Sequence, residues 1–252
     1  YESLDNKISD EELAILAENN IAFGKWLQRN TRSHKIPGYT SVTLSLKPTG
    51  VAPGDVTDSQ LEVIADLADA YSFGEIRATH NQNLVLADVK KSDLFKLWEK
   101  AKVSGFATPN IGTLTDMICC PGGDFCSLAN AKSIPIAEAI QRKFDDIDYI
   151  YDLGDLSLNI SGCMNAFGHH HFGNIGVLGV DKKGAVFYQF SIGCSSKREA
   201  KLVNFLGPSF AHTYIPSLLA DLVCFYLSIR FSSETFICTL VSLLLLLFHY
   251  PF

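Results

Sequence analysis

The chain has 252 residues, of which 47% are hydrophobic and 19% charged, and its formal net charge is −6. This composition is that of a globular protein with enough apolar residues to form a core. The negative charge gives no reason to expect nucleic acid or an anionic membrane surface as a partner.

The N-terminal residues are acidic and polar, without the basic segment and early apolar run of a secretory signal. They begin with Tyr1 and not Met, so we expect a fragment or a processed product, with a cytoplasmic location. Seven cysteines without an export signal favour metal or redox chemistry over a disulfide framework, and small buried apolar side chains are the alternative. These are Cys119, Cys120, Cys126, Cys163, Cys194, Cys224 and Cys238.

The first hundred residues show a regular order of elements. Apolar residues at helical spacing predict an amphipathic helix over 10–31, and Pro37 and Gly38 then break the chain. Alternating residues predict a strand over 39–46 with Val42, Leu44 and Leu46 on one side. Thr57 and Gln60 form a capping box for the helix that follows. Short strands are predicted at 75–79 and 84–89, around the polar turn 80–83.

Ser92 is predicted to cap a second helix that stops near Gly105, and residues 106–108 could begin a last strand. The order strand, helix, strand, strand, helix, strand is typical of a ferredoxin-like unit. We therefore expect an α+β protein with a helical linker at 1–36 and a ferredoxin-like half-domain at 37–108.

Residues 109–208 have a different character and form the second predicted α+β domain. Helical spacing over 128–144 is interrupted by Pro135, residues 156–161 alternate as a strand, and 175–180 and 185–192 predict a hairpin. Residues 209–252 form an apolar tail, with a helix possible at 216–231. Residues 235–252 approach the ~18–20 apolar residues that span a bilayer, but a buried or aggregating end is favoured over a membrane anchor.

Two glycine-containing segments carry the candidate chemistry. Cys120 and Cys126 bracket five residues, and Cys163 directly follows a predicted strand and Gly162. Thiolates suit iron–sulfur clusters, and glycine loops let backbone N–H groups approach the sulfur atoms. The spacing supplies three ligands without a certain fourth. A zinc site completed by one of His169, His170 and His171 is the alternative.

The segments C-x5-C and G-C-x-N-x-F-G closely resemble the paired signature of the sulfite and nitrite reductase haemoproteins, C-x5-C and G-C-x-N-x-C-G. The matching residues are Cys120, Cys126, Gly162, Cys163, Asn165 and Gly168. Further stretches at 37–53, 77–86, 111–131, 181–191 and 206–210 also look like this family, so the resemblance covers about residues 20–215.

The resemblance implies a fold with two ferredoxin-like half-domains and two sirohaem-domain repeats, of which this chain would hold the second of each. It implies a 4Fe-4S cluster bound by Cys120, Cys126 and Cys163, and sirohaem whose carboxylates lie against Asn165. Arg77, Asn81 and Gln82 are further candidates for the cofactor's acidic rim, because guanidinium and amide groups pair with carboxylates. A simple exposed position is the alternative for Arg77.

The implied activity is six-electron reduction of sulfite to sulfide or nitrite to ammonia. Ferredoxin or a flavoprotein would donate electrons, and a missing N-terminal half could be a partner. No nucleic-acid or membrane partner is expected.

Phe167 stands where the family has the cysteine that also bridges to the sirohaem iron. Phenylalanine has no donor atom, and the candidate replacements are Cys119, Cys194 and one of the three histidines. The competing hypotheses are therefore a degenerate non-catalytic copy and a structural Cys/His metal-binding module.

Overall fold

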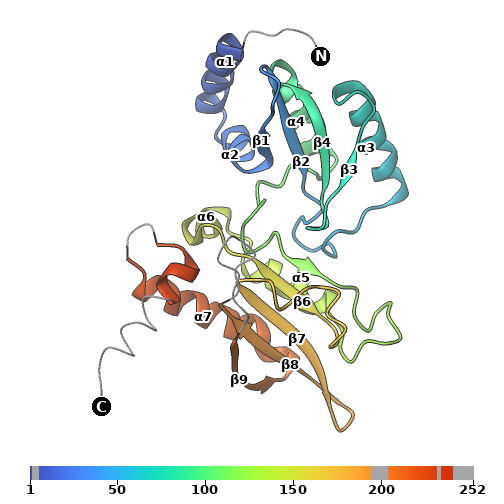
Figure 1. Cartoon of the computed structure of the whole chain (residues 1–252), viewed down its shortest axis with the longest axis vertical. Coiled ribbons are helices and arrows are strands. Elements are labelled where there is room, and N and C mark those ends of the chain that lie inside the picture. Colours follow the sequence, from blue (N-terminus) through green and yellow to red (C-terminus); the bar gives the residue numbers. More distant parts are fainter. Residues whose placement is uncertain (2–5, 194–203, 232–233, 241–252) are drawn as a thin grey trace. The chain divides into compact units, whose positions relative to one another are not determined.

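The computed structural model describes residues 1, 6–193, 204–231 and 234–240. It divides the chain into two compact units, Tyr1–Ile111 and Gly112–Phe252, and each is described by itself (Figure 1). Cys194 and the apolar run at 241–252 lie outside the described residues. The protein is α+β, as the sequence predicts.

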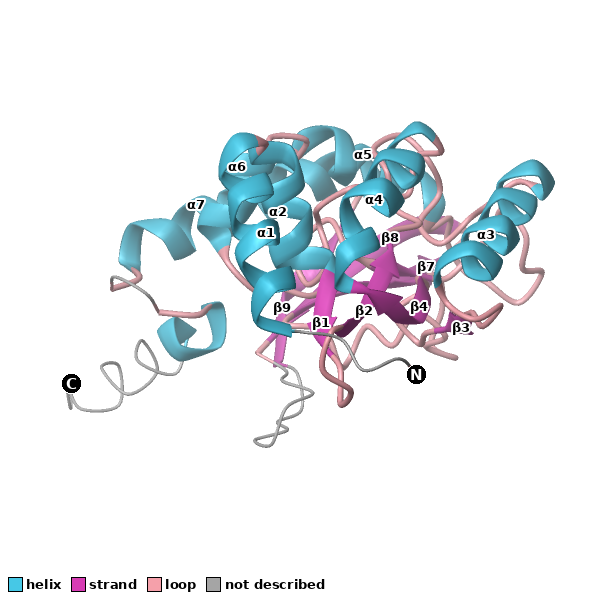
Figure 2. Cartoon of the chain, turned by 90° about the horizontal axis from the view of Figure 1, so that it is seen from above, coloured by secondary structure: helices cyan, strands magenta, loops and turns pink. Residues whose placement is uncertain are grey.

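The first unit contains one antiparallel sheet with strand order β1-β2-β4-β3, and helices α2, α3 and α4 lie over one face of it (Figure 2). Its elements are α1 (Asn6–Asn19), α2 (Ile21–Asn30), β1 (Thr31–Ser33), β2 (Tyr39–Leu44), α3 (Asp58–Tyr71), β3 (Arg77–Ala78), β4 (Leu84–Lys90), a 3₁₀ turn (Lys91–Asp93) and α4 (Leu94–Val103).

The core of this unit confirms the strand periodicity. Val42, Leu44 and Leu46 all point into one cluster, where they pack with aromatic residues of α2 such as Phe23 and Trp26. The capping box of α3 is also confirmed. Thr57 Oγ1 accepts from the Gln60 N–H at 3.2 Å, and Gln60 Oε1 accepts from the Thr57 N–H at 3.0 Å.

Three local predictions for this unit are wrong. The helix expected at 10–31 is split, because Asn20 accepts from the Phe23 N–H at 3.0 Å and caps a new helix. Ser92 does not cap α4, which begins at Leu94 after a 3₁₀ turn with Asp93 at its N-cap. Residues 106–108 form no strand. Phe106 O accepts the Ser45 N–H, and β1 pairs with the neighbouring edge of β2.

The second unit contains a five-stranded mixed sheet with order β5-β6-β7-β8-β9. Its elements are β5 (Ile118–Cys119), α5 (Ile134–Lys143), α6 (Ile147–Leu153), β6 (Leu158–Ser161), β7 (Ile175–Lys182), β8 (Ala185–Ile192), β9 (Asn204–Phe210), a 3₁₀ turn (His212–Tyr214) and α7 (Ile215–Ile229). The three strands β5, β6 and β7 are parallel, and β8 and β9 run antiparallel to their neighbours.

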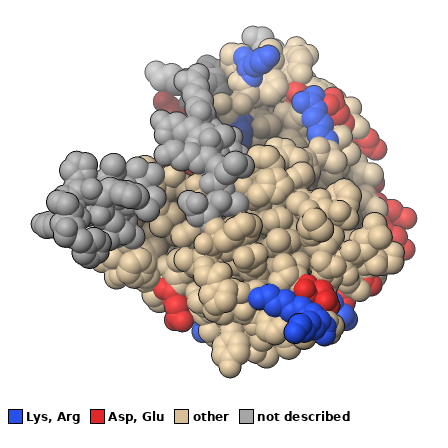
Figure 3. All heavy atoms as spheres, turned by 60° about the horizontal axis from the view of Figure 1, so that its bottom comes forward, with Lys and Arg blue, Asp and Glu red and all other residues tan. Residues whose placement is uncertain are grey.

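One face of this sheet supplies the second core. Ile160 and Val177 of the parallel strands pack with Ile140 of α5 and with Leu219 and Val223 of α7. The predicted hairpin of β7 and β8 is confirmed, and α5 starts only at Ile134 because Pro135 sits in its first turn. Figure 3 shows the molecule turned so that the bottom of Figure 1 comes forward, and few Lys, Arg, Asp or Glu side chains are seen on this face.

Part of the apolar helix α7 packs into the core of this unit. Among the described residues, one helical stretch, His212–Ile229, is long and apolar enough to cross a membrane by length and composition. Ile215, Leu219, Val223 and Tyr226 of this stretch are buried in the core. A core helix passes the same test of composition, so this stretch by itself does not indicate a membrane span.

Candidate metal and cofactor site

The two cysteine segments leave the sheet at the same edge. Cys120 directly follows β5, and Cys163 lies two residues beyond β6. These strands are parallel, with Cys119 opposite Ile160, and the Cys120 N–H donates to Ile160 O at 3.1 Å. Because parallel strands have their carboxyl ends at one edge, both loops start side by side.

Backbone hydrogen bonds hold the two loops together. Gly162 O accepts from the N–H groups of Asn130 and Ala131 at 2.9 and 3.0 Å, and within the first loop the Gly123 N–H donates to Ala131 O at 2.8 Å. A Cβ on Gly162 would lie 2.7 Å from Ala131 O and 2.8 Å from Gly122 Cα. Glycine is therefore required at position 162 because the two backbones are in direct contact.

The thiols of these loops differ in their surroundings. Cys120 and Cys163 are buried, with 8% and 6% of their surfaces exposed, and Cys126 is half-buried. The Gly162 N–H donates to Cys120 Sγ at 3.0 Å, and Ser133 Oγ lies 3.5 Å from the same sulfur. Hydrogen bonds of this kind to sulfur stabilise a thiolate and tune an iron–sulfur cluster. Cys120 is thus the cysteine of these loops whose sulfur accepts a backbone hydrogen bond.

Phe167 is 72% exposed on a tightly packed turn. Ala166 and His169 have positive φ angles of 60° and 50°, and His169 N donates to Ala166 O at 2.7 Å. A Cβ on Gly168 would lie 1.8 Å from Ile160 O, so this turn is pressed against β6. The turn is well defined, but the side chain that it presents at position 167 cannot bind a metal.

The three histidines belong to the same loop and do not complete a ligand set. His170 is 7% exposed, and its Nδ1 has no hydrogen-bond partner. Burial and the nearby His171 lower the pKa of His170 to about 4, so its ring is neutral. His171 packs against Phe172 with a ring separation of 4.4 Å. Within the described residues, no three His, Cys, Asp or Glu side chains are placed to hold a metal ion together.

The described residues therefore do not form a complete ligand set for an iron–sulfur cluster. Cys120, Cys126 and Cys163 supply thiols from two loops that touch, and a backbone N–H already points at one sulfur. The family's fourth position is Phe167, which supplies nothing. The donor set therefore does not match the four-cysteine set that the resemblance implies.

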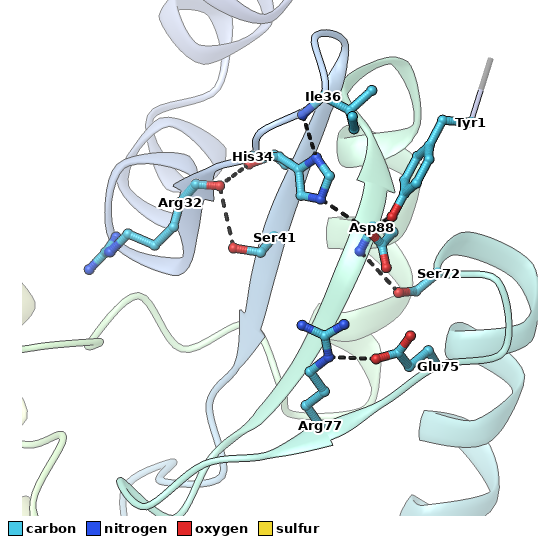
Figure 4. Close-up of polar contacts among 10 residues, drawn as sticks. Tyr1, Arg32, His34, Ile36, Ser41, Ser72, Glu75, Arg77 and Asp88 are labelled. Carbon is cyan, nitrogen blue, oxygen red and sulfur yellow. Dashed lines mark hydrogen bonds and ion pairs between the residues drawn. The ribbon is translucent and has the colours of Figure 1, made fainter.

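The cofactor-binding candidates are divided between the two units. Asn165 is exposed on the second cysteine loop. Arg77 belongs to β3 of the first unit, where its Nε donates to Glu75 Oε1 at 2.5 Å (Figure 4). This hydrogen bond raises the pKa of Arg77 above its usual value. The Asn81 side chain is exposed, and Gln82 is half-buried with a φ of 57°.

Each unit has one feature near the candidate residues that was not expected from the sequence. Lys47 is 1% exposed and its Nζ donates to Asn81 O at 2.5 Å, so a buried lysine supports the turn that carries Asn81. The cysteine loops also expose the large apolar side chains of Phe125, Leu128 and Met164. The sequence did place Phe125, Leu128 and Met164 in or beside glycine-containing loops, where apolar side chains are often exposed. No sequence pattern marks a lysine that will be buried.

Another polar cluster lies in the first unit, around the buried carboxylate of Asp88 (Figure 4). Asp88 Oδ1 accepts from the Tyr1 hydroxyl at 2.8 Å and pairs with His34 Nε2 at 3.0 Å. His34 Nδ1 accepts from the Ile36 N–H at 3.0 Å, so both ring nitrogens are occupied. These contacts connect the segment after β1 to β4. Because both ring nitrogens of His34 are engaged, this histidine is not a candidate acid or base.

The family model and the curated proteins that match this chain belong to the nitrite and sulfite reductases. The nitrite/sulfite reductase ferredoxin-like half domain matches residues 37–103. The assimilatory ferredoxin-dependent nitrite reductase of Haloferax mediterranei is 27% identical over 191 residues, which are 74% of this chain and 33% of the relative. Sulfite reductase [ferredoxin] 2 of Mycolicibacterium paratuberculosis is 28% identical over 53% of this chain and 25% of the relative.

Solved structures show the same fold. The Mycobacterium tuberculosis NirA protein aligns with a TM-score of 0.69 at 22% identity, over 84% of this chain and 40% of that one. Dissimilatory sulfite reductase I aligns with a TM-score of 0.66 at 12% identity, over 81% of this chain and 66% of that one. The chain spans a third or less of the length of the two curated relatives named above.

Proposed function

We propose that this chain, which belongs to the nitrite/sulfite reductase family, is the cofactor-carrying part of a sirohaem-dependent reductase of nitrite or sulfite. The observation that carries this proposal is the pair of cysteine loops joined at the carboxyl ends of β5 and β6. Both nitrite and sulfite reductases are among its relatives, so the two substrates remain alternatives. Both relatives are named as ferredoxin-dependent enzymes, which supports ferredoxin as the electron donor of this chain. A flavoprotein is the alternative donor.

The residues of this chain would hold the cofactors in the following way. Cys120, Cys126 and Cys163 would bind iron, and the Gly162 N–H would stabilise the charge on the Cys120 sulfur. The exposed amide of Asn165 would meet the carboxylates of sirohaem. Arg77, whose Nε donates to Glu75 Oε1, is the candidate of the first unit for such a carboxylate. When bound, sirohaem and the cluster supply the redox centres for a six-electron reduction.

A degenerate, non-catalytic copy is the second candidate function. It is favoured by one observation, the exposed phenylalanine in place of the fourth ligand. The two candidates differ in whether nitrite or sulfite is consumed, and they share the same fold and the same thiols.

The test is to produce the full chain with sirohaem and iron supplied, and to record its ultraviolet–visible spectrum and its consumption of nitrite and sulfite from a reduced viologen dye. Cys120→Ser and Cys163→Ser should lose the iron–sulfur absorption. Cys238→Ser is the matched control, because Cys238 is exposed and lies beyond α7. A spectrum without haem or cluster bands would refute cofactor binding, and bands without turnover would leave the non-catalytic copy.

A further inference from the structure

We infer that the outer face of α3 and α4 is the surface through which two copies of this chain associate. Figure 2 shows the two helices on the same face of the sheet of the first unit. Gln60 Nε2 donates to Ser104 O at 3.4 Å, which places the start of α3 beside the end of α4. The helices are therefore neighbours that run in opposite directions. The cysteine loops belong to the second unit, so this inference does not depend on the proposed function.

An open groove of about 430 Å³ lies between the two helices. Its apolar lining includes Val63 and Leu67 of α3 and Val103 of α4. Val103 is 90% exposed. A single exposed valine is ordinary on a monomer, but this one adjoins an apolar groove, and a continuous apolar surface of this kind is typical of an interface.

The two helices carry opposite charges. α3 has four carboxylates and no lysine or arginine, whereas α4 has three lysines and one carboxylate. All of these side chains are exposed, namely Asp58, Glu62, Asp66 and Asp69 on α3, and Lys96, Glu99, Lys100 and Lys102 on α4. Within the part of the chain that the structure describes, no ion pair joins the two helices. The ammonium groups of Lys100 and Lys102 lie instead over the rings of Tyr71 and Trp98, at 5.2 and 5.0 Å.

A second copy of the chain complements this face in both charge and apolar character. Like charges four residues apart, such as Glu62 and Asp66, destabilise a helix by themselves. A twofold axis parallel to the helices places α3 of each copy over α4 of the other. The carboxylates of each α3 then face lysines, and Val103 of each copy meets the groove of the other.

The size of this face indicates a weak and reversible dimer. Helices of 14 and 10 residues, packed side by side, form a face about 20 Å long and about 20 Å wide. This area is at the low end of specific interfaces, which is typical of transient association. Exposed charges around it should make the association depend on salt.

The experiment is sedimentation equilibrium of the full chain over a range of protein concentrations, at low and at high salt. We expect a monomer–dimer equilibrium whose dissociation constant rises at high salt, because salt screens the exposed charges. One variant reverses α3, with Glu62→Lys and Asp66→Lys, and another reverses α4, with Lys96→Glu and Lys100→Glu. Each should raise the dissociation constant about tenfold or more, because like charges then face each other across the interface.

An equal mixture of the two reversed variants should recover the wild-type association. In a dimer that contains one of each, every α3 faces an α4 of opposite charge, and no contact within a single chain can produce this recovery. Val103→Asp should also lose the dimer. Ile21→Asp is the matched control, because Ile21 is an apolar side chain of α2 that is 73% exposed, and it should keep the dimer.

Three outcomes would overturn the inference. The first is a wild type that stays monomeric at every concentration. The second is a dimer that both reversed variants keep, which would place the interface elsewhere on the chain. The third is a mixture of the reversed variants that remains as dissociated as each variant alone.

Discussion

Cys119 and Cys120 are adjacent in the chain, yet the structure gives them opposite environments. Cys119 faces the apolar core, and Cys120 lies in the loop, where its sulfur accepts the Gly162 N–H. Successive side chains of a strand point to opposite faces of its sheet, so the two neighbouring side chains leave β5 in different directions. Two neighbouring residues of one type are therefore separated into a structural residue and a candidate ligand by strand alternation.

His170 should make the stability of the protein depend on pH. Its pKa is lowered to about 4 from the ordinary value of 6.5, mainly by burial. Between these values the unfolded chain binds a proton that the folded chain does not, so the free energy of unfolding decreases as the pH falls from 6.5 to about 4. After allowing for screening by solvent, we expect a loss of about 1–2 kcal/mol over this range.

The measurement is urea unfolding at several pH values across this range. His170→Gln should lose less stability on acidification than the wild type. His212→Gln, at an exposed position, is the control and should follow the wild-type curve. Parallel curves for wild type and His170→Gln would show that this histidine does not contribute.

The turn at 166–169 is an element whose position depends on one glycine. A Cβ on Gly168 would lie 1.8 Å from Ile160 O, and it would therefore push the loop away from β6. We expect Gly168→Ala to lower the free energy of unfolding by about 2–4 kcal/mol, as overpacking of a buried site does.

Gly184 provides a matched comparison for this substitution. It has a φ of 83° in the β7–β8 hairpin, and no atom lies within 4 Å of the position that a Cβ would take. Gly184→Ala therefore costs only the left-handed backbone conformation, about 1–2 kcal/mol. Thermal or urea unfolding of the two variants measures the difference. Equal costs would mean that the loop can move off β6 without a penalty.

The start of α3 allows a separate test of a single helix cap. Thr57→Ala removes the acceptor of the Gln60 N–H, and we expect a loss of about 1 kcal/mol in the free energy of unfolding. Ser92→Ala is the control, since the 3₁₀ turn between β4 and α4 makes Asp93 the N-cap residue there. A Ser92→Ala cost as large as that of Thr57→Ala would contradict the assignment of the two caps.

At the scale of the whole molecule, each unit has its own apolar core. Leu44 is buried in the first core and Leu219 of α7 in the second, both without exposed surface. We expect Leu44→Ala and Leu219→Ala each to cost about 2–5 kcal/mol, as truncation of a buried leucine does. Each should lower mainly the unfolding transition of its own unit, which differential scanning calorimetry of the full chain can resolve. One transition shifted equally by both variants would show a single cooperative structure.

The sequence by itself determined much of the first unit and the order of elements in the second. Alternation at Val42, Leu44 and Leu46, the capping box at Thr57 and the β7–β8 hairpin depend on short-range chemistry, and the structure confirms them. The split at Asn20 was missed, because an asparagine between two apolar stripes can either continue a helix or cap a new one. The two-residue strand β5 is too short to have a periodicity of its own.

Only the tertiary structure decided how the candidate site is built. The cysteine motifs and Phe167 are visible in the sequence, but pairing of β5 with β6 is what brings the loops of Cys120 and Cys163 to one edge. The side of the sheet on which Cys119 lies, the burial of Lys47 and the fixed turn around Phe167 follow from contacts between residues far apart in the chain. Local patterns contain no information on such contacts, because the free energy that selects them comes from packing the whole unit.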